Sequence, residues 1–447
     1  MEPERLFKRK IYDRLLQWKE NSKGKSALLI EGARRIGKST IVKAFARNEY
    51  ESFIFIDFTK CPQEVKDLFS DISDLNYIFL RLQLIYGVQL VERKSLIVFD
   101  EVQFQPLARQ AVKSFVEDRR YDYIETGSLI SIRKNTQNIL IPSEEERISM
   151  YPMDYEEFRW ALGDTATIPI LRSVWEHPQP LKEAHHKLMR DFRLYMLVGG
   201  MPQAVDTYIE SNNFEVVDRT KRLILDLYDE DFSKIDPTGK AARIFAAIPA
   251  QLNGNASRYQ ISSVIPWAHA EDFIELISEM EKTRTVNISH HSDDPNAGLG
   301  STEELMRYKM FVADTGLFVT LAFKDKAFTE NIIYEKLLSD KLPANLGYLY
   351  ENIVAQMLTA SGNKLFYHTW PTESGKHNYE VDFLLSRGAK ITPIEVKSSS
   401  YKTHASLDAF CGKYSSRITN DRYLIYPKDY AHDESVRYIP TYLTFFL

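Results

Sequence analysis

The sequence predicts an α/β protein whose first third forms a parallel sheet with helices on both faces. Short apolar runs at residues 28–30, 53–56, 96–99 and 121–124 have the length and composition of buried strands. Helical patterns separate these runs, at residues 39–47, 75–86 and 108–116. Strands that alternate with helices in this way usually belong to one parallel sheet.

The pattern changes twice further along the chain. Residues 155–233 are mostly helical, with a turn at residues 198–202, and short helices continue to residue 323. Candidate strands lie at residues 285–288 and 309–312. From residue 346 a helix at residues 348–358 precedes strands at residues 365–368, 379–385 and 391–396, which predicts a second α/β domain.

Length and composition narrow the class of protein. A chain of 447 residues suggests about two to four domains. The net charge of -5 lacks the basic surplus that is typical of a small nucleic-acid binder. Cys61 and Cys411 lie far apart, which argues against a cysteine-based zinc site and fits a reducing cytoplasm. No apolar run approaches the ~18 residues that a membrane span needs, and the N-terminus lacks the apolar segment of a signal peptide.

Residues 32–39 match the pattern G-x-x-x-x-G-K-[ST] of a phosphate-binding loop. Its glycines allow the backbone to fold around phosphate oxygens, and the following helix N-terminus offers positive partial charge. Lys38 is expected to reach the β- and γ-phosphates, and the Ser39 hydroxyl to bind Mg²⁺. The motif follows a predicted strand and opens a predicted helix, as the mechanism requires. The expected nucleotide-binding residues are Gly32, Ala33, Arg34, Arg35, Ile36, Gly37, Lys38, Ser39 and Thr40.

Two acidic residues, Asp100 and Glu101, end the buried strand at residues 96–99. Carboxylates at the end of a buried strand are costly unless they have a role. We expect Asp100 to hold Mg²⁺, and Glu101 to orient and deprotonate the attacking water. A water-activating base favours hydrolysis over phosphoryl transfer to a small molecule. After the fourth strand, Ser128 is the candidate sensor of the γ-phosphate and Thr126 the second candidate; a simple polar turn is the alternative.

Charged residues near the C-terminus form a second candidate site. Glu395 and Lys397 are two residues apart on a predicted strand, so they point to the same face. Asp382 lies on the preceding strand, and Glu351 on the preceding helix. If the strands pair, Asp382 and Glu395 would bind a metal ion, Lys397 would position water for attack on a phosphodiester, and Glu351 would assist. There are two alternatives. These residues could form a solvated strand face in which Glu and Lys pair across strands, or the domain could be a nuclease scaffold that only binds partners.

Two histidines stand beside two aspartates in the second half of the chain. His290 and His291 precede Asp293 and Asp294, which makes a metal cluster one interpretation. The surrounding residues 293–302 are rich in Asp, Gly, Asn and Ser. This composition favours an exposed loop, which is our expectation.

Taken together, these motifs resemble one family. The chain is similar to the bacterial and archaeal AAA-type ATPases that carry a C-terminal domain of unknown function, and the similarity extends over nearly its whole length. It rests on LIEGARRIGKS (29–39), FDEVQ (99–103), ETGS (125–128), IPSEE (141–145), YPM (151–153), GGMP (199–202), ADTGL (313–317), YEN (350–352) and EVKSS (395–399).

The resemblance implies an additional-strand ATPase core, in which the strand before Ser128 lies between the phosphate-loop strand and the Asp100 strand. It also implies a winged-helix-like middle region and a C-terminal fold similar to PD-(D/E)xK nucleases. The four positions of that nuclease pattern are filled by Glu351, Asp382, Glu395 and Lys397. The predicted domains are a P-loop ATPase domain at 1–160, a helical linker at 161–240, a winged-helix-like region at 241–325 and a nuclease-like domain at 326–447.

The leading hypothesis is therefore a Mg²⁺-dependent ATPase coupled to a nuclease-like, DNA-directed module. ATP and Mg²⁺ are the expected ligands, with a second Mg²⁺ or Mn²⁺ at the C-terminal site. The alternative is an ATP-switched interaction or regulatory protein with a catalytically inactive nuclease-like fold. DNA and a protein are the candidate partners in a cytoplasmic setting without a membrane. The sequence leaves the oligomeric state, the DNA preference and the pathway open.

Overall fold

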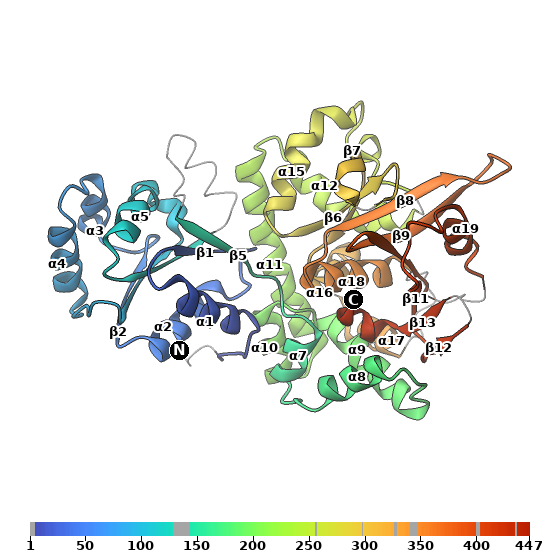
Figure 1. The fold of residues 1–447 in the computed structure, drawn as a ribbon, viewed down its shortest axis with the longest axis horizontal. Helices are drawn as coiled ribbons and strands as arrows, with labels where there is room; N and C mark the ends of the chain where they lie inside the picture. Colours follow the sequence, from blue (N-terminus) through green and yellow to red (C-terminus); the bar gives the residue numbers. More distant parts are fainter. Residues whose placement is uncertain are drawn as a thin grey trace. The chain divides into compact units, whose positions relative to one another are not determined.

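The structure, a computed structural model, describes residues 5–127, 144–254, 257–296, 298–325, 329–339, 347–398, 403–433 and 436–447. The chain divides into two compact units, Met1–Tyr151 and Pro152–Leu447 (Figure 1). The finer boundaries expected at residues 160, 240 and 325 stay predictions. None of the helices in this described part combines the length and the apolar character that crossing a membrane requires.

A five-stranded parallel sheet forms the centre of the first unit. Its strands are β1 (Ala27–Glu31), β2 (Ser52–Asp57), β3 (Ser95–Asp100), β4 (Asp122–Gly127) and β5 (Glu145–Ser149), in the order β2-β3-β4-β1-β5. The prediction that β4 lies between the phosphate-loop strand β1 and the acidic strand β3 is confirmed. Because parallel strands end at the same edge of a sheet, the carboxyl ends of β1, β3 and β4 are neighbours.

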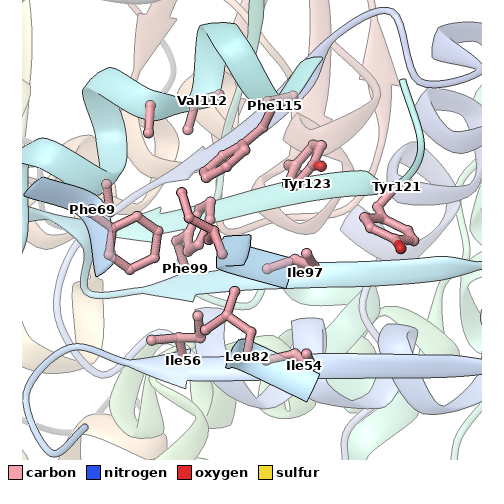
Figure 2. Packing of buried hydrophobic residues seen from close by; sticks show 14 of the residues in the cluster. Ile54, Ile56, Phe69, Leu82, Ile97, Phe99, Val112, Phe115, Tyr121 and Tyr123 are labelled. Carbon is pink, nitrogen blue, oxygen red and sulfur yellow. The ribbon is translucent and has the colours of Figure 1, made fainter. Parts of the chain in front are cut away.

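Helices pack against this sheet and bury its apolar side chains. They are α1 (Ile11–Ser22), α2 (Lys38–Glu49), α3 (Gln63–Asp67), α4 (Leu75–Tyr86) and α5 (Pro106–Asp118), with short 3₁₀ turns η1 (Leu68–Ser70) and η2 (Val102–Phe104). Figure 2 shows aromatic rings of η1, β3, α5 and β4 gathered in one core. The ring centroids of Phe69 and Phe99 are 5.7 Å apart, and those of Phe115 and Tyr123 are 5.5 Å apart. This core fixes β3 and β4 beside each other.

An eight-stranded mixed sheet forms the centre of the second unit. Its strands are β6 (Val286–Ser292), β7 (Glu303–Val312), β8 (Leu365–Pro371), β9 (Asn378–Arg387), β10 (Lys390–Val396), β11 (Tyr423–Tyr426), β12 (Ala431–His432) and β13 (Arg437–Pro440). The order is β12-β13-β11-β10-β9-β8-β6-β7. The hairpin β6–β7 comes from the region expected to be winged-helix-like, yet β6 pairs directly with β8. The winged-helix and nuclease-like identities stay predictions.

Helices precede, interrupt and flank this sheet. They are α7 (Tyr155–Ala161), α8 (Thr167–Glu176), α9 (Glu183–Val198), α10 (Pro202–Ser211), α11 (Phe214–Ile235), α12 (Lys240–Ala246), α13 (Ile248–Asn253), α14 (Ile261–Val264), α15 (Ile274–Lys282), α16 (Thr315–Ala322), α17 (Asn331–Leu338), α18 (Gly347–Ala360) and α19 (Ala405–Lys413). Short 3₁₀ turns are η3 (Ala270–Phe273), η4 (Leu299–Thr302) and η5 (Thr441–Phe446). Residues 155–254 are thus mostly helical, as the sequence predicts.

The motifs GGMP, ADTGL and YEN meet in the core of the second unit. Asp314 accepts hydrogen bonds from the backbone N–H groups of Gly200, at 2.6 Å, and Leu317, at 2.8 Å. Asn352, on α18, accepts from the N–H of Val312 at 2.9 Å and donates to its carbonyl oxygen at 3.1 Å. Buried polar groups are stable when they are bonded in this way. These motif residues therefore hold a turn, the end of β7 and α18 together.

The expectation of an exposed loop around the two histidines is wrong. His290 and His291 lie on β6, where 6% and 1% of their surfaces are exposed. His290 faces Glu303 and His291 faces Glu304, each at 3.3 Å between ring nitrogen and carboxylate oxygen. Polar residues can occupy buried strand positions when partners satisfy them, which an apolar pattern does not reveal. Leu299 in η4 is also buried, so the segment after β6 is only partly exposed.

Candidate nucleotide site and carboxylate cluster

The phosphate loop connects β1 to α2 through a tight backbone turn. Gly37 precedes α2 with a φ of 93°, in the left-handed region that glycine adopts most readily. At Gly32, an added Cβ would lie 2.5 Å from the carbonyl oxygen of Met150, so a larger residue does not fit. Both glycines of the motif are therefore required by the geometry of this chain. The loop leads directly into the first N–H groups of α2, which suit anion binding.

Lys38 lies inside this loop. Its side chain is buried, and the Nζ ammonium donates to the carbonyl oxygens of Gly32 and Ala33, at 2.9 Å each. Arg35, by contrast, is exposed and has a φ of 65°. A buried positive charge within a loop that opens a helix is the arrangement that recognition of a triphosphate needs.

Asp100 joins the ends of three elements at one point. The Ser39 hydroxyl, on α2, donates to Asp100 Oδ1 at 2.7 Å. The Thr126 hydroxyl, on β4, also donates to Asp100 Oδ1 and lies 3.3 Å from the backbone N–H of Glu101. A hydroxyl beside a carboxylate supplies the oxygen donors that Mg²⁺ prefers. The two residues expected to hold Mg²⁺ are thus in direct contact.

Glu101 has an uncommon backbone conformation. Its φ is 54°, which for a residue other than glycine costs on the order of 1–3 kcal/mol and often occurs at functional sites. Its carboxylate accepts a hydrogen bond from Gln103 Nε2 at 2.5 Å. Backbone and side chain are therefore both held in place. Ser128, the first candidate for the γ-phosphate sensor, lies outside the described residues, whereas the second candidate, Thr126, contacts Asp100.

A buried ion cluster next to this site was not predicted. Arg109 on α5 lies 3.1 Å from Glu125 Oε2 and 2.7 Å from Glu145 Oε2, and all three side chains are almost fully buried. Burial raises the pKa of Glu125 to about 8, against the lowering effect of the Arg109 charge. Glu125 directly precedes Thr126, so the cluster ties the end of β4 to α5 and β5. Nothing in the local sequence around Arg109 distinguishes it from a solvent-exposed helix residue.

The four C-terminal candidates come together, and β9 and β10 form the antiparallel hairpin that the hypothesis required. The backbone N–H of Val396 donates to Asp382 Oδ2 at 2.8 Å. Lys397 Nζ lies 2.5 Å from Glu395 Oε1. The other oxygen of Glu395 is buried and accepts no hydrogen bond from the described residues. Glu351, on α18, is close enough to raise the pKa of Asp382.

Lys309, on β7, reaches into the same cluster and was missed by the sequence prediction. Its Nζ lies 3.4 Å from Glu351 Oε2 and 3.8 Å from Asp382 Oδ1, and it also contacts Glu380. Only 6% of the Lys309 side chain is exposed. An ammonium group of the chain itself therefore lies beside Asp382, one of the two expected metal ligands, and beside Glu351, the expected auxiliary residue.

The electrostatics of this cluster follow from burial and from the number of carboxylates. Burial raises the pKa of Asp382 well above its usual value, and the charge of Glu351 raises it further. Burial alone would lower the pKa of Lys309, but the carboxylates of Glu351, Glu380 and Asp382 outweigh it and raise this pKa. Lys309 thus stays positively charged and neutralises part of the excess negative charge.

Family models match the chain in three parts. Residues 24–159 match an AAA domain, AAA_14. The chain carries an AAA-type P-loop ATPase domain. Residues 189–327 and 346–443 match two domains of unknown function, DUF8612 and DUF4143. An AAA ATPase domain implies ATP and Mg²⁺ as ligands, whereas the descriptions of the other two models name no function. No curated protein matches the chain.

The solved structures that match this chain share little sequence with it. The Orc1 protein of Aeropyrum pernix in complex with DNA is 13% identical, covers 76% of this chain and 94% of its own, and has a TM-score of 0.27. The RuvB Holliday junction branch migration motor of Thermotoga maritima is 11% identical; the match covers 64% of this chain and 91% of that chain, with a TM-score of 0.29. A signal transduction ATPase with a tetratricopeptide repeat sensor from Pyrococcus horikoshii is 12% identical; the match covers 80% of this chain and 50% of that chain, with a TM-score of 0.31. Likenesses with TM-scores this low do not indicate what this chain does.

Proposed function

We propose that this protein binds ATP together with Mg²⁺ and hydrolyses the ATP at the loop of residues 32–39, while its second unit serves as an interaction module. The observation that carries the ATPase proposal is the contact between Ser39 and Asp100, at 2.7 Å, beside a loop that holds Lys38 in its interior. The match of residues 24–159 to an AAA domain supports the same proposal.

Each residue of the site has a specific role in the proposal. The backbone N–H groups of residues 32–40 bind the phosphates, and Lys38 stabilises negative charge on the β- and γ-phosphates. Ser39 and Asp100 would hold Mg²⁺, which neutralises phosphate charge when bound. Glu101 orients the attacking water and accepts its proton. The strained backbone at Glu101 helps to fix the direction of this carboxylate.

Residues at the end of β4 complete the proposed site. Thr126 positions Asp100 through its hydroxyl hydrogen bond. Ser128 stays the proposed sensor of the γ-phosphate, two residues further along the chain. A Thr126→Val variant keeps the shape of the side chain but removes the hydroxyl, so we expect Mg²⁺-dependent turnover to fall while binding of metal-free nucleotide persists.

The test is ATP binding and turnover in matched variants. Lys38→Ala should lose both, whereas Glu101→Gln should bind ATP but turn it over about 10²–10⁴-fold more slowly, because only the base is removed. Lys60→Ala is the control, because the Lys60 side chain is 83% exposed and lies outside the loop. Equal turnover in the wild type, Lys38→Ala and Lys60→Ala would refute the ATPase proposal.

The ion pairs of Lys309 support an interaction module over a nuclease. A metal ion at Asp382 would have to compete with the buried Lys309 ammonium group, whose Nζ lies 3.8 Å from Asp382 Oδ1 and 3.4 Å from Glu351 Oε2. We therefore expect no Mg²⁺- or Mn²⁺-dependent cleavage of duplex, single-stranded or branched DNA by the wild-type protein. Cleavage that disappears in Asp382→Asn would overturn this part of the proposal and favour the nuclease-like, DNA-directed module instead.

A further inference from the structure

An irregularity in the β6–β7 hairpin brings three metal-ligand side chains together. The pairing register shifts between His290 and His291, and bulges of this kind redirect side chains and often lie at functional sites. Next to the bulge, His291, Asp293 and Glu304 each offer one ligand atom, and these atoms all lie within 4.8 Å of one another. This group shares no residue with the nucleotide site or with the Lys309 cluster.

His291 provides an independent sign that the group is built for a ligand. Only 1% of its surface is exposed, and its Nδ1 atom makes no well-aligned hydrogen bond with the residues that the structure describes. Oε2 of Glu304 lies 3.3 Å from that atom. A buried ring nitrogen this close to a carboxylate is stabilised either by its own proton or by a cation between the groups.

The opposite edge of the imidazole is held by the backbone. Nε2 of His291 lies 3.1 Å from the N–H of Thr369 and 3.4 Å from its carbonyl oxygen. The N–H of Thr369 donates to Nε2, so the neutral ring carries its proton on Nδ1 in this structure. An ion bound at Nδ1 would replace that proton, which would move to Nε2, where the carbonyl oxygen of Thr369 or its hydroxyl oxygen, 3.3 Å away, can accept it.

The separation of the ligand atoms fits a small divalent ion. In a tetrahedral site with metal–ligand bonds of about 2.0–2.1 Å, neighbouring ligand atoms are about 3.3–3.4 Å apart. The 3.3 Å between His291 Nδ1 and Glu304 Oε2 agrees with this spacing. Asp293 is exposed, so its carboxylate can adjust to the ion without breaking a packed core.

Charges around the group are compatible with a cation. The carboxylates of Asp293 and Glu304 supply negative charge next to the His291 ring. Arg307 Nη1 lies 3.2 Å from Glu304 Oε2 and competes for that oxygen. A carboxylate has about four lone-pair positions on two oxygens, so Glu304 can accept from Arg307 and bind an ion at the same time.

We infer that His291, Asp293 and Glu304 form a binding site for a divalent transition-metal ion. One nitrogen and two oxygen donors suit Zn²⁺, with water completing the coordination. The ion would link the end of β6 to β7 and secure the segment between them. This inference does not depend on ATP hydrolysis.

Titration of the full chain with Zn²⁺, after treatment with a chelator, tests the inference by calorimetry. Asp293→Asn and Glu304→Gln should each weaken binding of one ion by about tenfold or more, because each removes a ligand. Asp294→Asn is the matched control, since Asp294 is an exposed neighbour that pairs with Arg417 and not with the group. An ion bound near Asp100 would remain in every variant and is counted separately.

Co²⁺ provides a second readout that reports on the ligands themselves. The wild-type protein should give the visible absorption of four- or five-coordinate Co²⁺, and His291→Gln should change this spectrum because the nitrogen donor is lost. Circular dichroism without metal checks that each variant is folded. Arg307→Gln should bind Zn²⁺ more tightly, because a competing cation is removed. A wild-type protein that binds no ion at this site, or equal binding in Asp293→Asn, Glu304→Gln and Asp294→Asn, would overturn the inference.

Discussion

Lys309→Met is the substitution that tests most directly how the carboxylate cluster of the second unit is stabilised. Methionine keeps most of the length and apolar character of the side chain but removes the charge. At an effective dielectric constant of about 20, a pair at the 3.4 Å separation of Lys309 and Glu351 attracts by about 5 kcal/mol before desolvation. Breaking a buried pair by removing one partner costs about 3–5 kcal/mol.

The expected loss for Lys309→Met lies at the low end of this range, about 3 kcal/mol. The reason is that the side chains of Glu351 and Glu380 are 24% and 27% exposed, so water screens part of the remaining repulsion. Denaturation in urea gives the free energy of unfolding from the midpoint and the slope. The double variant Lys309→Met with Glu380→Gln should recover part of the loss, because one of the unpaired carboxylates is removed.

Lys364→Met is the matched control for this experiment. Lys364 also pairs with a glutamate, Glu303, but its side chain is 57% exposed, so we expect a change of at most about 1 kcal/mol. Millimolar Mg²⁺ should stabilise Lys309→Met more than the wild type if the freed carboxylates bind a cation. A Lys309→Met protein as stable as the Lys364→Met protein would refute the view that Lys309 neutralises the cluster.

Further predictions concern the phosphate loop and two buried titratable groups. Gly32→Ala should lose nucleotide binding and about 1–3 kcal/mol of stability, measured by fluorescent-ATP titration and thermal unfolding, because the added Cβ meets Met150. Burial raises the pKa of Glu125 from 4.5 to about 8, so the stability that the protonated carboxyl contributes is complete below pH 4.5 and is lost as the pH rises to about 8. In Glu125→Gln, the free energy of unfolding from urea titrations should decrease less over this pH range than in the wild type. Burial lowers the pKa of His368 from 6.5 to about 4, so stability falls by up to about 3 kcal/mol as the pH drops through this window, and His368→Gln should reduce the acid sensitivity.

Sequence reasoning works best where the relevant signal is local. The phosphate loop is a contiguous motif between a strand and a helix, so its residues and the neighbouring Asp100 could be named before the structure was known. The position of β4 between β1 and β3 followed from the family resemblance and is confirmed. The hairpin that joins Asp382 to Glu395 could also be predicted, because its two strands are adjacent in the chain.

The contacts that were missed are all long-range. Lys309 is 42 residues from Glu351 and 71 from Glu380, and on its own strand it has the pattern of an ordinary exposed lysine. Arg109 similarly finds Glu125 and Glu145 only when α5 packs against the sheet. The burial of His290 and His291 depends on carboxylates of the partner strand β7. None of these pairings leaves a signature in a window of neighbouring residues.

The pairing of β6 with β8 has a practical consequence for how this chain can be divided. Residues 189–327 and 346–443 match separate family models, yet they contribute adjacent strands to one sheet. Expressing either half alone would leave a long strand with an open hydrogen-bonding edge, which promotes aggregation. Fragments for biochemical work should therefore be cut near residue 151 and keep everything after it in one piece.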